Sequence, residues 1–340
     1  MKLGRPLILG IGGSGDIVGS SFVLNLLNRV YNLDGYLASI SWERHVIDPV
    51  PGPIRTMEWR NANVVNDVIV EVDKNSYAVR LSNVIKPQAV KVSKVIGRNL
   101  YSVDNYQGPK RVAEGIYDLC NKLGITSIIG VDVGGDVLAE GKEEGLSSPL
   151  IDSISLASLE ILRRMGINSI LAVMSPGSDG ELKISEIEER TSLIIKDGGY
   201  FGSLGFGKED LPFMEKVLSE AETEASKIAY LALRGEFGNY EIRNRTKRVD
   251  IGLISTIVMF FSVESVYNFS PLAKAVFNTE NVMEASKRLN DLGLYTEYDF
   301  EVDLFSLYGL EASKVDGNVI NKIREEGKRR IKGGKPRGDI

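Results

Sequence analysis

The fold is decided by the stretch SIIGVDVGGDVLAEGKEEGLSSPLIDSISLASLEILRRMGINSILAVM, residues 127–174. It opens with the apolar, β-rich run 127–131, which is typical of a strand buried on both faces of a parallel sheet. A helix is predicted from 148 to 165, because serine and proline favour its start and Asp152 complements the helix dipole. Residues 169–174 predict a second strand. This order indicates a right-handed parallel crossover and therefore an α/β protein.

The same alternation of strands and helices extends outward from this stretch. The expected strands are 7–9, 36–40, 68–72, 77–81 and 255–263, and the expected helices are 18–31, 110–123, 210–234, 271–277, 281–292 and 318–331. Closely spaced prolines within 42–66 exclude a helix or a central strand there. We therefore predict a Rossmann-like, doubly wound, mostly parallel sheet with helices on both faces and a more helical C-terminal half.

The chain shows no linker rich enough in proline, glycine or serine to divide it. We predict a single α/β domain over residues 1–327, in which 205–327 could form a helical subdomain, and a basic tail over 328–340. The tail holds six basic residues, so the first 327 residues carry 35 basic against 45 acidic side chains. Such an acidic body repels nucleic acid and argues against sequence-specific binding to it. The tail could touch a polyanion, although a solvated, fraying terminus is the commoner meaning of such a run.

Composition narrows the class of protein further. The 340 residues are 43% hydrophobic and 26% charged, which is globular composition. No apolar run approaches the roughly 20 residues needed to cross a bilayer, so no membrane partner is expected. The single cysteine, Cys120, excludes an internal disulfide and multi-cysteine metal sites, and its helical spacing places it in the core. We expect a cytoplasmic protein, and the presence of only two glutamines hints at a thermophilic source.

A glycine-rich turn follows the first expected strand. Its glycines match G-x-G-x-x-G and are followed at once by Asp16; they are Gly10, Gly12, Gly13 and Gly15. Backbone amides in such a turn, at the start of a helix, can bind a phosphate of a nucleotide. However, Asp16 places a negative charge where a pyrophosphate would lie, and no acid is well placed for a ribose. The turn therefore favours a phosphorylated ligand over an ordinary dinucleotide.

The same pattern, a glycine turn followed by an aspartate, recurs after the strand at 127–131. There, GVDVGGD places Asp132 and Asp136 around Gly134 and Gly135, and a third strand ends in a turn that contains Asp179. Because such turns emerge at one edge of a parallel sheet, we expect these acids to share a crevice with Asp16. Asp16, Asp132 and Asp136 could then hold Mg²⁺ against a phosphorylated ligand. The alternative is that each aspartate caps a helix or braces its own turn.

Three further segments could serve this crevice. Glu43 and Arg44 leave the second strand at the same edge, whereas the neighbouring His45, the only histidine, is interpreted as a surface residue. A cationic cluster could bind phosphate or form a solvated run; it comprises Arg243, Arg245, Lys247 and Arg248. The glycine-rich segment 196–207 could be a mobile lid or an irregular loop.

Several of these motifs together resemble a known family. They are the opening glycine–aspartate turn, WER (42–44) with DPVPGP (48–53), VDVGGD (131–136) with SPL (148–150), and GSDGEL (177–182). In this order they resemble the mainly archaeal family catalogued as domain of unknown function 1152, over at least residues 8–182. The resemblance implies a soluble protein with a Rossmann-like sheet and implies no activity.

The residues favour an enzyme that binds a nucleotide or a phosphorylated metabolite. Asp132, Asp136 and Arg44 are the predicted catalytic residues for Mg-dependent phosphoryl transfer or hydrolysis, which needs positioning and charge more than a side-chain nucleophile. Two alternatives stay open: a Rossmann protein that binds a dinucleotide or S-adenosylmethionine through the first turn alone, and a non-catalytic ligand-binding or regulatory protein. A homo-oligomer is expected on general grounds.

Overall fold

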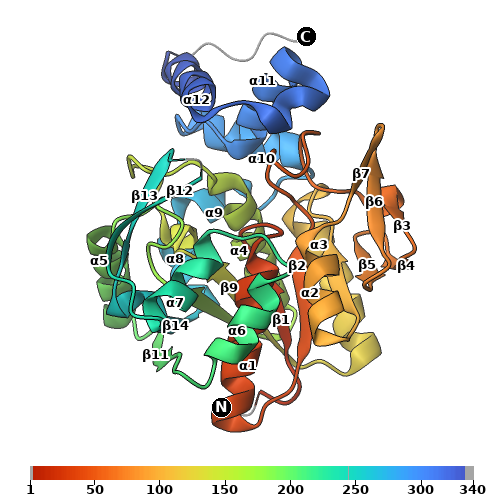
Figure 1. The fold of residues 1–340 in the computed structure, drawn as a ribbon, viewed down its shortest axis with the longest axis vertical. Helices are drawn as coiled ribbons and strands as arrows, with labels where there is room; N and C mark the ends of the chain where they lie inside the picture. The colour runs from red at the N-terminus through yellow and green to blue at the C-terminus, as the bar shows by residue number, and fades with distance from the viewer. Residues whose placement is uncertain (1–2, 244, 334–340) are drawn as a thin grey trace.

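A nine-stranded mixed sheet forms the centre of the computed structural model, which describes residues 3–243 and 245–333 (Figure 1). In spatial order its strands are β11 (Tyr200–Gly205), β14 (Ile257–Ser262), β10 (Asn168–Met174), β9 (Ser127–Val133), β1 (Leu7–Gly10), β2 (Tyr36–Ile40), β8 (Leu100–Val103), β5 (Ile69–Val72) and β4 (Asn63–Asn66). Two smaller antiparallel sheets consist of β3 (Trp59–Arg60), β6 (Tyr77–Arg80) and β7 (Asn83–Ile85), and of β12 (Gly238–Ile242) and β13 (Lys247–Ile251).

Helices cover both faces of the main sheet. They are α1 (Asp16–Tyr31), α2 (Gln88–Ile96), α3 (Gly108–Leu123), α4 (Pro149–Arg164), α5 (Ile184–Lys196), α6 (Leu211–Leu218), α7 (Ala225–Leu233), α8 (Val263–Phe269), α9 (Pro271–Val276), α10 (Val282–Asp291), α11 (Glu297–Tyr308) and α12 (Gly317–Lys332). Short 3₁₀ turns lie at Thr56–Glu58, Asp136–Leu138, Leu253–Thr256 and Gly309–Lys314. None of the helices in the described part of the chain has the length and apolar character of a membrane span.

The expected α/β architecture is confirmed, but the sheet is not mostly parallel. Only the five central strands, β10-β9-β1-β2-β8, run parallel to one another. On either side of them, β14 and β11, and β5 and β4, pair antiparallel. A tight turn joins β4 to β5 and imposes antiparallel pairing, whereas the other antiparallel partners are far apart in the chain. Periodicity within a single strand carries no information about its direction. The Rossmann-like label stays a prediction.

The central strands are apolar on both faces, as the sequence predicted. In β1, Leu7 and Leu9 pack into the core that contains α3 and α4, whereas Ile8 packs into the core that contains α1 and α2. Because successive side chains point to opposite faces, a strand between two helical layers needs apolar residues at every position. Cys120 of α3 lies in the first of these cores, as predicted.

The strand order creates a switch point between β1 and β9. From β1 the chain proceeds through β2 to β8 on one side, and then returns to β9 and β10 on the other side. The loops after β1 and β9 therefore diverge from adjacent strand ends and leave a crevice, which is where open α/β sheets bind ligands. The glycine–aspartate turns follow these two strands, so the fold brings them together as expected.

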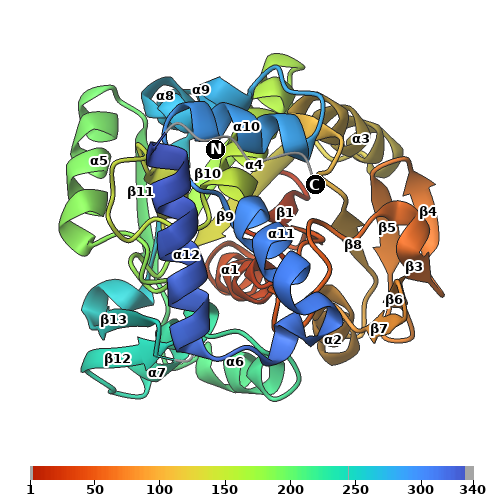
Figure 2. The ribbon, with the colours of Figure 1, turned by 90° about the horizontal axis from the view of Figure 1, so that it is seen from above.

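Helices α11 and α12 lie over this edge of the sheet (Figures 1 and 2). Seen from above, they cross the end of α1 and the central strands, and they have a small core of their own around Phe300 and Leu304. Lys328 to Lys332 of the predicted basic tail belong to α12, and residues 334–340 lie outside the described residues. The division into domain, subdomain and tail stays a prediction.

Three predicted segments differ from the structure. The helix expected over 210–234 is two helices, α6 and α7, separated by residues 219–224. The segment 196–207 contains β11, which pairs with β14 at the edge of the main sheet, so the lid hypothesis is wrong. Its many glycines are compatible with an edge strand, where side-chain packing is required on fewer sides. Finally, the cations at 243–248 belong to the β12–β13 hairpin.

Candidate functional site

A cavity of about 730 Å³ opens at the switch point. The turns after β1, β2, β9 and β10 line it from below, the β12–β13 hairpin lines one side, and α11 and α12 line the roof. The predicted site residues that line it are Gly12, Gly13, Gly15, Asp16, Glu43, Arg44, Asp132, Asp136 and Asp179, whereas Gly10, Gly134 and Gly135 lie behind its wall. Chain segments about 160 residues apart therefore meet in one place, as the sequence predicted.

Asp16 is partly engaged in bracing its own turn. Its Oδ2 accepts hydrogen bonds from the amides of Gly12 (2.8 Å) and Val133 (3.4 Å). A Cβ at Gly12 would lie 2.8 Å from this oxygen, so glycine is required for the approach. The Gly12 amide, which the sequence assigned to a phosphate, thus binds a carboxylate instead. Burial raises the pKa of Asp16 to about 7.

Asp132 and Asp136 lie at the end of β9 and in the turn that follows it. Oδ2 of Asp132 accepts a hydrogen bond from the Val137 amide (3.1 Å), whereas its Oδ1 is buried without a partner in the described residues. Asp136 accepts a hydrogen bond from the Ser148 hydroxyl (3.3 Å). Burial, reinforced by neighbouring carboxylates, raises the pKa of both aspartates well above the usual value. Each is therefore costly as an isolated anion.

Asp152 joins these two aspartates, although the sequence assigned it only to the helix dipole. It projects from the first turn of α4 and is 3% exposed, with an unpartnered buried Oδ1. Carboxylate oxygens of Asp132, Asp136 and Asp152 lie within 4.8 Å of one another and could hold a metal ion. Burial and the charges of Asp132 and Asp16 raise the pKa of Asp152 well above its usual value. Asp152 follows Ser148-Pro149 in the first turn of the helix after β9, and this position could have indicated it as a site residue.

A second carboxylate group contains Asp136, Asp179 and Glu181, which also lie within 4.8 Å of one another. Asp179 approaches Gly134 so closely that a Cβ there would lie 2.3 Å from its carboxyl carbon, and Gly134 has a φ of +128°. Oδ2 of Asp179 is unpartnered among the described residues, and burial raises its pKa to about 6. This geometry explains the glycine at 134 as room for a carboxylate.

Glu181 is the most fully bonded acid of the site. Its Oε2 accepts hydrogen bonds from the amides of Ser147 (2.7 Å) and Ser148 (2.9 Å). Its Oε1 accepts from the Ser148 hydroxyl (2.6 Å) and from Arg243 Nη1 (2.7 Å). The charge of Arg243, followed by that of Lys247, overcomes the effect of burial and lowers the pKa of Glu181 far below its usual value. A guanidinium already neutralises this side of the cluster, which leaves the first group as the better cation site.

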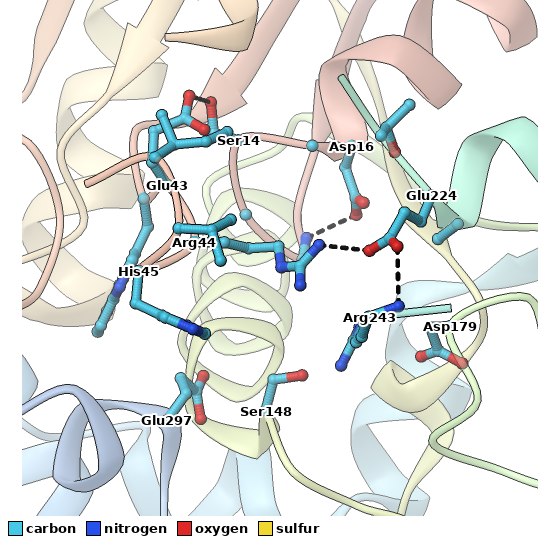
Figure 3. A pocket seen from close by; sticks show the side chains of 18 of the residues that line it. Ser14, Asp16, Glu43, Arg44, His45, Ser148, Asp179, Glu224, Arg243 and Glu297 are labelled. Carbon is cyan, nitrogen blue, oxygen red and sulfur yellow. Dashed lines mark hydrogen bonds and ion pairs between the residues drawn. The ribbon is translucent and has the colours of Figure 1, made fainter. Parts of the chain in front are cut away.

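The cationic cluster is divided by the hairpin. Arg243 and Lys247 line the cavity, whereas Arg245 and Arg248 are exposed and pair with Glu241 on the surface. Arg44 pairs with Glu224 (2.6 Å), which also accepts a hydrogen bond from the Arg243 amide (2.8 Å; Figure 3). The loop between α6 and α7 thus joins Arg44 to the hairpin across the cavity.

Glu43 and His45 are both buried in the segment that follows β2. Glu43 accepts hydrogen bonds from the Ser14 hydroxyl and from the Gln88 amide, and burial raises its pKa to about 7. The interpretation of His45 as a surface residue is wrong: it lines the cavity, 9% exposed, with its ring packed edge-on against Phe300. Burial, with the charge of Arg44, lowers its pKa to about 3, so the imidazole is neutral.

Helix α11 brings two more buried acids that the sequence did not indicate. Glu297 accepts hydrogen bonds from the amides of Leu150 (3.0 Å) and Ile151 (2.7 Å) at the start of α4. Glu301 accepts from Trp42 Nε1 (2.9 Å) and from the Gly52 amide (2.9 Å). Burial raises the pKa of Glu297 to about 7 and that of Glu301 to about 8. Glu297 therefore attaches the roof to α4, and Glu301 attaches it to the segment that follows β2.

Glu301 allows a test of this electrostatic arrangement. Its pKa is raised on folding, so its favourable contribution is complete below the pKa of the unfolded chain and is lost as pH rises to about 8. We expect wild type to lose stability relative to Glu301→Gln between pH 4.5 and 8, by at most about 1.4 kcal/mol per pH unit. Urea unfolding of both proteins at several pH values measures this difference. A constant difference across that range would contradict the raised pKa.

Comparison with known proteins gives one match. The model of the family described as Protein of unknown function (DUF1152) matches residues 7–305, which include every strand of the main sheet and both carboxylate groups. No curated protein and no solved structure matches the chain.

Proposed function

We propose that this chain, which belongs to the DUF1152 family of unknown function, is a Mg-dependent enzyme that transfers or hydrolyses a phosphoryl group of a nucleotide or another phosphorylated metabolite. The observation that supports this most directly is the group formed by Asp132, Asp136 and Asp152. These three buried carboxylates lie within 4.8 Å of one another, and two of them have an unpartnered oxygen. Asp132 and Asp136 line a cavity that also contains guanidinium groups.

The donor set fits a hard divalent cation. All three side chains offer oxygen, which Mg²⁺ prefers, and a histidine-based site is excluded because the only histidine is His45. Placing three carboxylates together without a cation requires protonation, as their raised pKa values indicate. In this proposal Asp132, Asp136 and Asp152 hold the metal. Asp16, which the sequence also predicts as a ligand, is left out of this set because its Oδ2 is already bonded to two amides.

The other side chains suit the handling of a phosphate. A bound Mg²⁺ would supply charge for a transferring phosphoryl group. Arg44 and Arg243 stand on the cavity wall, where they would neutralise charge that develops on phosphate oxygens. Gly13 and Gly15 line the cavity just before α1, where their backbone amides would face a bound phosphate.

Metal binding is the first experiment. We expect Mg²⁺ or Mn²⁺, added to protein stripped on a chelating resin, to raise the melting temperature. A free metal concentration of 100 times Kd adds about 2.7 kcal/mol. The shift should be larger at pH 8 than at pH 5, because protons compete for carboxylates whose pKa values are raised. No shift with any divalent cation at pH 8 would remove the metal from the proposal.

The second half of the experiment tests chemistry. A panel of nucleotides and phosphorylated metabolites, incubated with the metal-loaded protein, should release phosphate or transfer it to an acceptor. Binding of panel members without any turnover would favour the non-catalytic alternative. Tight nucleotide binding that persists in the stripped protein would instead favour the dinucleotide or S-adenosylmethionine alternative.

A further inference from the structure

Helix α12 contributes a cation to the roof of the cavity. Arg324 lines the cavity with its guanidinium carbon 4.0 Å from the centre of the Phe300 ring, and it donates a hydrogen bond to the Ser147 carbonyl (3.1 Å). Within residues 3–243 and 245–333, no carboxylate forms an ion pair with it. Arg324 lies after residue 305, where the family match ends, so family membership alone does not point to it.

Lys247, on β13, is a second such cation. It lines the same cavity and donates to the Gly145 carbonyl, and in the described part of the chain it too has no carboxylate ion pair. Carbonyl groups satisfy hydrogen bonds but carry no net charge. Burial lowers the pKa of both Arg324 and Lys247, while the charge of Glu181 acts in the opposite direction on each. Both side chains are half-buried on the cavity wall, and cations that bond only to carbonyls there favour a ligand of the opposite charge.

The segment 145–148 places these cations beside the carboxylates. Its amides at Ser147 and Ser148 are held by Glu181, while its carbonyls at 145 and 147 receive the two cations. The Ser148 hydroxyl donates to both Glu181 and Asp136. The hydroxyl of Ser147 is buried and has no hydrogen-bond partner among the described residues. Ser148, which bonds to Asp136, is therefore the neighbour of Ser147, whose carbonyl bonds to Arg324. The two cations thus lie beside the proposed metal group.

We propose that Arg324, Lys247 and the Ser147 hydroxyl form a subsite for a phosphate group, so that the ligand of this cavity is a phosphorylated small molecule held from α12. A guanidinium and an ammonium are the cations that proteins use for phosphate, and a free hydroxyl adds a donor. The inference rests on the proposed function for the metal beside the phosphate. The cationic subsite itself is measurable without metal.

The test uses inorganic phosphate and pyrophosphate as probes on metal-stripped, full-length protein. Calorimetry should detect binding to wild type, and Arg324→Gln should weaken it at least tenfold. Arg329→Gln is the matched control, because Arg329 lies on the same helix but is exposed and paired with Glu325. It should bind both probes like wild type.

Two results would overturn the subsite: no binding of either probe to wild type at millimolar concentration, or equal binding by wild type and Arg324→Gln. If Arg324→Gln does not fold, Lys247→Gln replaces it with the same expectation. Metal titration of each variant separates this inference from the proposed function. Loss of probe binding with an unchanged metal-induced melting shift supports the subsite, whereas equal loss of both shows that the substitution disturbed the whole cavity and contradicts it.

Discussion

Replacing Asp132 by Asn is expected to abolish the rise in melting temperature that Mg²⁺ produces, while the metal-free protein remains at least as stable as wild type. The Asn side-chain oxygen can keep the hydrogen bond from the Val137 amide. Its amide group can donate to a neighbouring carboxylate, and one of the like charges that raise the pKa of Asp152 disappears. The loss should therefore appear in metal binding and not in folding. Thermal melts with and without Mg²⁺ at pH 8 measure both quantities.

Asp104→Asn is the matched control for this substitution. Asp104 is also a buried aspartate directly after a central strand, and burial raises its pKa, but it lies outside the cavity. Its oxygens accept hydrogen bonds from Arg55 Nε (2.8 Å) and the Tyr106 amide (2.9 Å). The control should lose stability and keep the full metal-induced shift. The metal group is refuted if Asp132→Asn keeps the shift, or if it unfolds while the shift of the residual folded protein is unchanged.

Replacing Arg243 by Met should destabilise the protein by about 3 kcal/mol, near the lower end of the usual cost of leaving one member of a buried ion pair alone. The Glu181 side chain is completely buried and would lose its only guanidinium partner in the described part of the chain. Three donors from Ser147 and Ser148 remain, which limits the loss. Denaturant unfolding at pH 7 gives the free energy of unfolding directly.

Arg248→Met provides the comparison for this second substitution. Arg248 lies on the same hairpin, but it is exposed and pairs with Glu241 on the surface (3.2 Å), so its removal should cost less than about 1 kcal/mol. Adding Glu181→Gln to Arg243→Met should recover part of the lost stability, because the unpaired charge is then absent. Similar losses for Arg243→Met and Arg248→Met would show that the buried pair contributes little.

Much of the central architecture could be predicted from local pattern. Residues 128–131 and 170–174 contain no polar side chain, which is typical of strands buried on both faces. The glycine–aspartate turns were predicted to meet because parallel strands end at one edge, and Asp16, Asp132, Asp136 and Asp179 do line one cavity. Sheet topology alone therefore places these four acids at one edge.

The local signals for the remaining site residues were ambiguous or absent. Asp152 in the first turn of a helix is explained equally well by the helix dipole, and only packing brings it to Asp132 and Asp136. Glu297 and Glu301 lie in a helix with other acidic residues, and the sequence does not distinguish them from surface acids until α11 is placed over the sheet edge. His45 was assigned to the surface because its neighbours are charged, yet Phe300 from that same helix covers it.

The sequence by itself determined the parallel core, the two glycine–aspartate turns and the edge at which they lie, because strand burial and turn chemistry are properties of short segments. Tertiary structure alone decided the antiparallel flanks, the roof of α11 and α12, and the choice of which acids keep an oxygen unpartnered. Direction of pairing and desolvation of a charge depend on residues far away in the chain. Glu181 and Asp179 are two residues apart, yet Arg243 from a distant hairpin lowers the pKa of the first while burial raises that of the second.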